Sequence, residues 1–132
     1  DPVDIVAHSD IAPNRKSDPG PNFPWEEFYR HGIGAWYDTS DFNEQLNKLK
    51  QQPPSILDVQ CALSIYGYPI ELTGAQDKQS QFAVRAFQLH FRPSSYSGLI
   101  DEETTAILYA LNKKYRSELT GDKTSCKKYS SK

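Results

Sequence analysis

Three apolar stripes with helical spacing lie between residues 55 and 117, and they constrain the fold more than any other feature of the sequence. The first follows Ser55 and ends at Gly67, the second ends before Pro93, and the third follows Asp101. Ser and Asp are typical residues before a helix, and Gly and Pro are typical after one. The stripes consist of Ile56, Val59, Leu63 and Tyr66; Phe82, Ala83, Ala86, Phe87 and His90 or Phe91; and Thr104, Ile107, Leu108, Leu111 and Tyr115. Three such amphipathic helices can share one small core.

The first 54 residues have a different pattern. Residues 3–7 are short and apolar-rich, which predicts the end of a buried strand, and residues 24–30 (PWEEFYR) predict a short amphipathic helix that stops before Gly32. Residues 41–54 are polar and end in two prolines, so they predict an interdomain connection with a helical turn or two that leans on a neighbour.

His8, Lys16 and Asp18 lie close together on a turn-rich segment at the end of the predicted strand. A neutral imidazole and a carboxylate are both zinc ligands, and a catalytic zinc takes three protein ligands and leaves one position open. A lysine beside a polarised carbonyl can stabilise an oxyanion. By spacing alone, His8 and Asp18 are more often a surface hydrogen-bonding pair than a metal site, because this spacing is not a general zinc signature.

The longer string HSDIAPNRKSDPGPNFPW, residues 8–25, closely resembles the signature of the zinc-dependent N-acetylmuramoyl-L-alanine amidases of the AmpD and AmiD type. These enzymes cleave the amide between the lactyl group of N-acetylmuramic acid and the first L-alanine of the peptidoglycan stem. The resemblance implies that His8 and Asp18 bind Zn²⁺ and that Lys16 assists catalysis.

The resemblance also implies a second zinc-ligand His and a general-base Glu upstream, and only seven residues precede His8. The other histidines are poor substitutes, because His31 comes at an expected helix end and His90 lies inside a helical stripe far along the chain. The chain contains no Met and starts with Asp, which indicates a processed or partial chain. We therefore expect half of an amidase active site that needs the upstream part of the amidase domain, so that the chain alone is inactive.

A second resemblance covers residues 55–117. The strings YGY at 66–68, AVRAFQ at 83–88 and GLID at 98–101 resemble the landmarks of the three-helix peptidoglycan-binding domain of many cell-wall hydrolases. FQLHFRP at 87–93 resembles this domain in the AmiD lipoprotein amidases. The usual Gly-x-x-Thr opening of the second helix is absent, and residues 77–80 (DKQS) stand there instead.

Together these features predict a mainly α chain, in which a three-helix peptidoglycan-binding domain follows the C-terminal end of an α/β amidase domain. The expected boundaries are residues 1–40 for the amidase part, 41–54 for the linker, 55–117 for the helical domain and 118–132 for a disordered, lysine-rich tail. The helical domain would either tether the enzyme to its polymer or extend the catalytic cleft.

Composition and charge bear on the partners and the location of the protein. The formal net charge of -2 gives no electrostatic reason to expect a nucleic-acid partner, and no apolar run is long enough for a transmembrane segment. Cys61 and Cys126 form neither a CxxC metal pair nor a convincing disulfide framework, and their redox state is open. The resemblance implies peptidoglycan or muropeptide partners and a periplasmic location, with an outer-membrane lipid anchor upstream. Two alternatives remain: a non-catalytic peptidoglycan-binding module and a structural protein-interaction domain.

Overall fold

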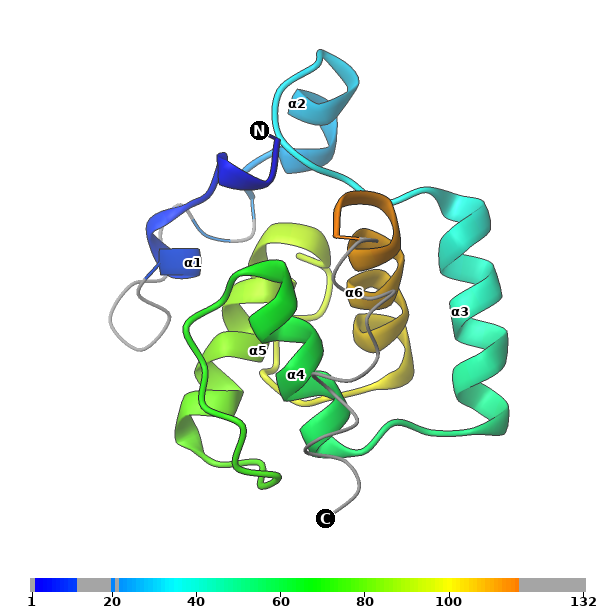
Figure 1. Ribbon diagram of the computed structural model, residues 1–132. Coiled ribbons are helices and arrows are strands. Elements are labelled where there is room, and N and C mark those ends of the chain that lie inside the picture. The colour runs from blue at the N-terminus through cyan, green and yellow to red at the C-terminus, as the bar shows by residue number, and fades with distance from the viewer. Residues whose placement is uncertain (1, 12–19, 21, 117–132) are drawn as a thin grey trace.

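A computed structural model describes residues 2–11, 20 and 22–116, and this part of the chain is helical without any strand (Figure 1). The elements are a 3₁₀-helix, η1 (Pro2–Asp4), and the α-helices α1 (His8–Ile11), α2 (Trp25–Arg30), α3 (Thr39–Gln51), α4 (Ile56–Tyr66), α5 (Lys78–Phe91) and α6 (Glu102–Tyr115). The mainly α fold class is thus confirmed. The tail predicted for residues 118–132 lies outside the described residues.

Helices α4, α5 and α6 form the core predicted from the three stripes. Leu63, Phe87 and Leu108, one from each helix, are at most 1% exposed. Helix α4 begins with a complete capping box, in which the Ser55 hydroxyl accepts a hydrogen bond from the Asp58 amide and the Asp58 carboxylate accepts one from the Ser55 amide. Both helix-initiating backbone groups are therefore satisfied.

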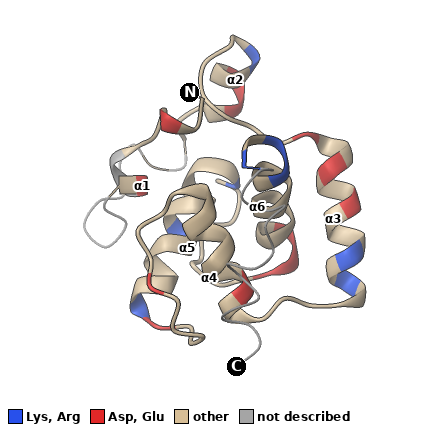
Figure 2. Cartoon of the chain, in the orientation of Figure 1, with Lys and Arg blue, Asp and Glu red and all other residues tan. Residues whose placement is uncertain are grey.

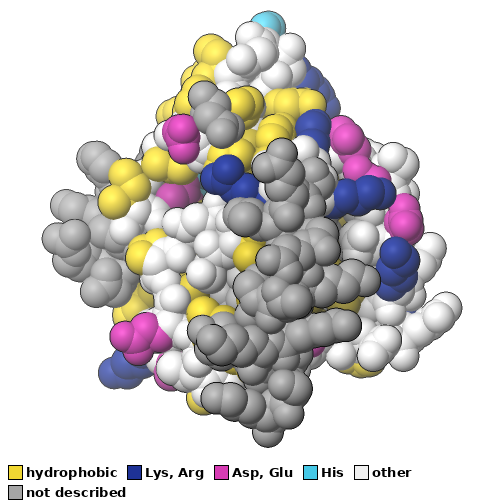
Figure 3. Space-filling view, viewed as in Figure 1, with side chains coloured by type: hydrophobic (Ala, Val, Ile, Leu, Met, Phe, Trp, Pro, Cys, Tyr) yellow, Lys and Arg dark blue, Asp and Glu magenta, His cyan; other side chains and the backbone are white. Residues whose placement is uncertain are grey.

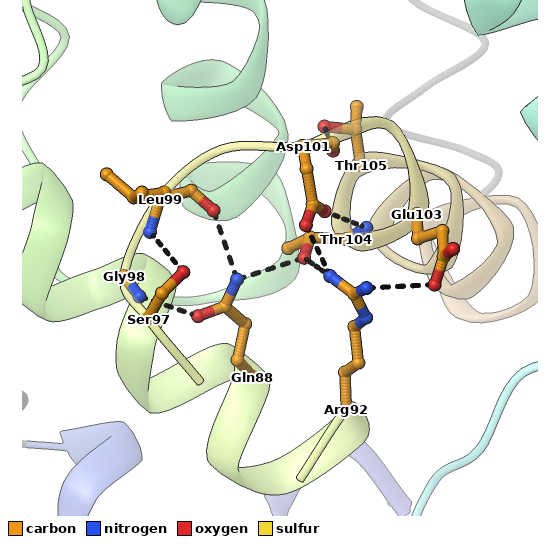
Figure 4. Close-up of polar contacts among 9 residues, drawn as sticks. All are labelled: Gln88, Arg92, Ser97, Gly98, Leu99, Asp101, Glu103, Thr104 and Thr105. Carbon is orange, nitrogen blue, oxygen red and sulfur yellow. Dashed lines mark hydrogen bonds and ion pairs between the residues drawn. The ribbon is translucent and has the colours of Figure 1, made fainter. Parts of the chain in front are cut away.

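A buried glutamine closes each of the two interhelical loops in the same way. In the loop before α6, the Gln88 Oε1 accepts from the Gly98 amide at 2.8 Å, and its Nε2 donates to the Leu99 carbonyl and the Thr104 hydroxyl (Figure 4). Asp101 caps the same helix by accepting from the Thr104 amide. The loop, the cap and the preceding helix are thus joined through one amide side chain.

Gln60 makes the equivalent contacts in the loop before α5. Its Oε1 accepts from the Gly74 amide at 2.8 Å, and its Nε2 donates to the Ala75 carbonyl and, at 2.7 Å, to the Ser80 hydroxyl. Asp77 caps α5 through the Ser80 amide. The unusual residues 77–80 therefore provide a working helix start, and Gly-x-x-Asp-x-x-Ser/Thr occurs twice, at 74–80 and 98–104.

Helix α3 is longer than the one or two turns predicted in the linker. It packs along α6, and its acidic N-terminal end meets the basic C-terminal end of α6 (Figures 1 and 2). The Lys113 Nζ lies 2.9 Å from Asp41, and the Lys114 Nζ lies 3.0 Å from Asp38. Leu49 on its inner face is only 4% exposed. The extra length follows from this continuous apolar and charged contact.

The strand predicted for residues 3–7 is wrong. Pro2–Asp4 form η1, and the segment then enters α1 through turns in which the Ile5 amide donates to the Pro2 carbonyl and the Asp10 amide to the Ala7 carbonyl. A strand needs a partner strand for its backbone groups, and the described residues contain none. Local turns satisfy these groups instead.

The helix predicted at 24–30 is confirmed as α2. Trp25 is buried, and the segment that follows returns to the core, where the Tyr115 hydroxyl hydrogen-bonds to the Trp36 backbone. The N-terminal part thus packs on the helical part.

Candidate functional site

The first four residues of the amidase-like motif, 8–11, form α1, which lies directly beside the helical domain. Asp10, two residues after His8, is only 6% exposed. Its Oδ2 accepts a hydrogen bond from the Ala7 amide at 3.0 Å and lies 2.8 Å from the Nδ1 of His90 on α5. Its Oδ1 accepts from the hydroxyl of Tyr68, just after α4. We call Asp10, Tyr68 and His90 the Asp10 cluster.

His90 is held between two aromatic rings. The Trp25 ring stacks on the imidazole at a centroid distance of 3.8 Å, and the Phe91 ring stacks at 4.0 Å. The ring is 3% exposed, so it is more deeply buried than the partly buried helix residue predicted from the sequence. Its Nδ1 is committed to Asp10, and its Nε2 has no hydrogen-bond partner among the described residues. This imidazole is therefore a fixed part of the contact between α1, α2 and α5.

Burial and the adjacent carboxylate shift the pKa of the neighbouring phenols. Burial, followed by the charge of Asp10 and the hydrogen bond to it, holds the pKa of Tyr68 well above its ordinary value. Burial and the Asp10 charge also raise the pKa of Tyr66. Tyr68 therefore remains a hydrogen-bond donor to Asp10 throughout the neutral pH range.

Two cavities flank the Asp10 cluster. One, of about 370 Å³, lies between the N-terminal segment and the end of α4, with Asp10, Tyr68 and Arg116 in its wall. The other is a broader groove of about 730 Å³ between α2 and the start of the loop after α5. Its lining combines aromatic and charged side chains, among them Trp25, Trp36, Tyr37, Arg30, Arg92 and Glu103. We call it the α2–α5 groove.

The predicted zinc and catalytic residues are placed only in part. His8 is the first residue of α1, and its side chain is not among those described. Lys16 and Asp18 lie outside the described residues. Within the described part of the chain, no three His, Cys, Asp or Glu side chains are grouped to hold a metal ion.

His31 lies, as predicted, at a helix end. It follows the last residue of α2, and its backbone amide donates to the Phe28 carbonyl. The role of Asp10 was not predicted from the sequence. Its partners Tyr68 and His90 are 58 and 80 residues away, and a motif of metal-ligand residues gives no information on such distant contacts.

Cys61 is buried in α4 and is disulfide-bonded, which corrects the expectation that the cysteines form no disulfide framework. The other cysteine, Cys126, lies outside the described residues. No helix in the described part has both the length and the apolar character needed to cross a membrane.

The two glutamine-closed loops lie within the region that matches a known domain family. The family described as "Putative peptidoglycan binding domain" matches residues 52–108. Over 115 residues, the chain is 42% identical to N-acetylmuramoyl-L-alanine amidase AmiD of Escherichia coli K12, which covers 86% of this chain and 41% of the relative.

Two solved amidase structures are similar to this chain over most of its length. The crystal structure of AmpDH3 from Pseudomonas aeruginosa is 47% identical and superposes with a TM-score of 0.83, covering 88% of this chain and 46% of that one. Escherichia coli AmiD, in complex with the substrate anhydro-N-acetylmuramic acid-L-Ala-D-gamma-Glu-L-Lys, is 39% identical with a TM-score of 0.76, over 87% of this chain and 45% of that one.

These comparisons support a portion of an N-acetylmuramoyl-L-alanine amidase of the AmpD/AmiD type with a peptidoglycan-binding domain, and both resemblances seen in the sequence are confirmed. It spans less than half the length of these relatives.

Proposed function

We propose that the chain is the C-terminal portion of a zinc-dependent peptidoglycan amidase, which hydrolyses the amide between the lactyl group of N-acetylmuramic acid and L-alanine. The observation that carries this proposal is the alignment of 86% of the chain with AmiD at 42% identity. An alignment of this length includes the region that matches the peptidoglycan-binding domain. In this proposal the amidase part ends at residue 40, the linker at residue 54 and the helical domain at residue 117.

In this proposal His8 and Asp18 are ligands of Zn²⁺ and Lys16 is a catalytic residue. An imidazole and a carboxylate are donors that zinc accepts, so this donor set fits the metal, and an upstream His would complete it. When bound, zinc supplies a Lewis acid that polarises the scissile carbonyl and lowers the pKa of water. The Lys16 ammonium would stabilise the negative charge that develops on the carbonyl oxygen. An upstream Glu would act as the base.

The upstream part of the amidase domain would cover the apolar surface of the N-terminal segment. Ile5, Val6, Ile11 and Ile33 are 39–64% exposed, although each is a large apolar side chain. Hydrophobic side chains gather on the part of the surface that Figure 3 shows around the N-terminal elements. Exposed apolar patches mark interaction surfaces. This exposure supports a missing domain partner.

We propose that peptidoglycan or its muropeptides contact the α2–α5 groove, so that the helical domain extends the catalytic cleft. Residues of both the amidase-like part and the helical domain line this groove. Aromatic side chains suit the apolar faces of sugars, and its arginines and glutamates suit the carboxylates and amines of stem peptides. A periplasmic site of action, with a lipid anchor upstream, follows from the same proposal.

The experiment that tests the amidase proposal uses the enzyme extended upstream to include the missing His and Glu. It should release stem peptide from muropeptides, and a chelator should stop it. Asp18→Ala should remove zinc and abolish turnover, whereas Asp4→Ala, outside the proposed ligand set, should retain both. Unchanged zinc content and turnover in Asp18→Ala would refute the assignment.

Two other functions predict different results. A non-catalytic peptidoglycan-binding module would bind sacculi, but its reading frame would lack the upstream His and Glu. A structural protein-interaction domain would not bind purified sacculi at all.

A further inference from the structure

We propose that Asp10 is a positioning residue, through which the peptidoglycan-binding helices hold α1, and with it His8, in place for metal binding. The inference rests on the proposed function for the role of His8. It assigns the helical domain a structural part in the metal site, in addition to contact with the polymer.

The first argument is that α1 is not stable without contacts to the rest of the fold. It has only four residues, and a helix of this length is unstable without tertiary contacts. Apolar burial contributes little to its attachment, because Ile11 is 64% exposed and Val6, just before it, is 39% exposed. Only Val3 and Ala7 are buried among the apolar side chains of residues 2–11. Ala7 and Val3 join the core, and among the described residues the side-chain hydrogen bonds that attach α1 to the helical domain are those of Asp10.

The second argument is that this tie is rigid. Asp10 is 6% exposed, and a buried carboxylate is costly to leave unpaired. Its partners come from three places: the Ala7 amide at the start of α1, the Tyr68 hydroxyl after α4 and the His90 ring in α5. The Trp25 ring, stacked on His90 at 3.8 Å, prevents the imidazole from turning away. Moving α1 would separate Asp10 from at least two of these partners.

The two neighbouring tyrosines provide a matched test. Tyr68→Phe removes the donor to Asp10 and keeps the ring. Tyr66→Phe removes a hydroxyl from a tyrosine whose ring stacks on Tyr68 at 6.2 Å. Within the described part of the chain, the Tyr66 hydroxyl makes no hydrogen bond, and only the Tyr66 backbone carbonyl accepts one from Arg116. Both substitutions delete one oxygen from the same buried region, so their comparison isolates the contact with Asp10.

The first measurement is amide hydrogen exchange on the 132-residue chain without metal or substrate. In Tyr68→Phe, the amides of Ala7 and Ile11 should exchange about tenfold faster, which is the effect expected for a lost hydrogen bond to a charged group. Amides of α6 should be unchanged. Tyr66→Phe should leave the exchange rates of the α1 amides unchanged, and Asp10→Asn should raise them as Tyr68→Phe does. Equal effects of both tyrosine variants, or no effect on α1, would overturn the inference.

The second measurement follows the His8 imidazole by NMR while the enzyme extended upstream to include the missing His and Glu is titrated with ZnCl₂. The half-saturating zinc concentration should rise about fivefold or more in Tyr68→Phe and stay constant in Tyr66→Phe. An unchanged value in Tyr68→Phe overturns the positioning role alone. Failure of His8 to respond to zinc in the unsubstituted extended enzyme contradicts the proposed function as well, so the two failures can be distinguished.

Discussion

Substituting the two loop glycines by alanine tests how tightly the loop before α6 is packed against α5. Gly98 has φ +81°, and a Cβ there would lie 2.9 Å from the Gln81 carbonyl oxygen and 3.5 Å from the Arg85 Cβ. Gly74, its counterpart in the other loop, has φ +74° and nothing within 4 Å of a Cβ. The two amides make the same 2.8 Å hydrogen bond to a buried glutamine. The pair therefore differs mainly in the close approach to α5.

The expected magnitudes follow from these differences. Positive φ costs an alanine about 1 kcal/mol at either site. At Gly98, a contact with helix backbone, which cannot move aside like a side chain, adds about 2 kcal/mol. Gly98→Ala should thus lower the free energy of unfolding by about 3 kcal/mol and Gly74→Ala by about 1 kcal/mol.

The assay is urea unfolding followed by far-UV circular dichroism. With a slope of about 1.5 kcal/mol per M, the midpoint should fall by about 2 M for Gly98→Ala and by about 0.7 M for Gly74→Ala. Equal losses in the two variants would refute the claim that contact with α5, and not backbone conformation, makes glycine necessary at position 98.

Three further predictions concern the same fold. Burial and the charge of Asp58 raise the pKa of Tyr109 to about 12, so this phenol ionises at lower pH in the unfolded chain than in the folded one. The free energy of unfolding should therefore fall between about pH 10 and pH 12. Tyr109→Phe should make this fall less steep, and an unchanged pH dependence would contradict the assignment. Asp101→Ala should lower stability by about 1 to 2 kcal/mol through loss of the α6 cap and the Arg92 ion pair, whereas exposed Glu102→Ala should change it by less than about 0.5 kcal/mol; similar losses would argue against the cap. Because Cys61 is disulfide-bonded, a thiol reagent should label Cys61 in the denatured chain only after reduction, and labelling of Cys61 before reduction would contradict this.

The helices could be predicted because their signals are local. The apolar stripes, the Ser55 and Asp101 caps and the Gly67 stop each depend on residues within a few positions, and the structure places α4, α5 and α6 where these signals indicated. The length of α3 was underestimated, because its stability comes from contact with α6 more than 60 residues away.

The site was less predictable for the same reason. The repeated glutamine clamps join residues in different helices and loops, so their pattern becomes meaningful only when the loop closures are known. Asp10 lies within the recognised motif, but its role depends on Tyr68 and His90, which the sequence separates widely from it. The strand predicted at residues 3–7 is wrong because a short apolar run does not show whether a partner strand is present.

Sedimentation of this chain with purified peptidoglycan sacculi tests most directly the claim that it acts at the cell wall. The account predicts that the chain sediments with sacculi, that Tyr37→Ala in the α2–α5 groove reduces the bound fraction severalfold, and that Tyr96→Ala, a partly exposed tyrosine outside the groove, leaves it unchanged. Circular dichroism would verify that both variants are folded. A folded chain that remains entirely in the supernatant would contradict the account.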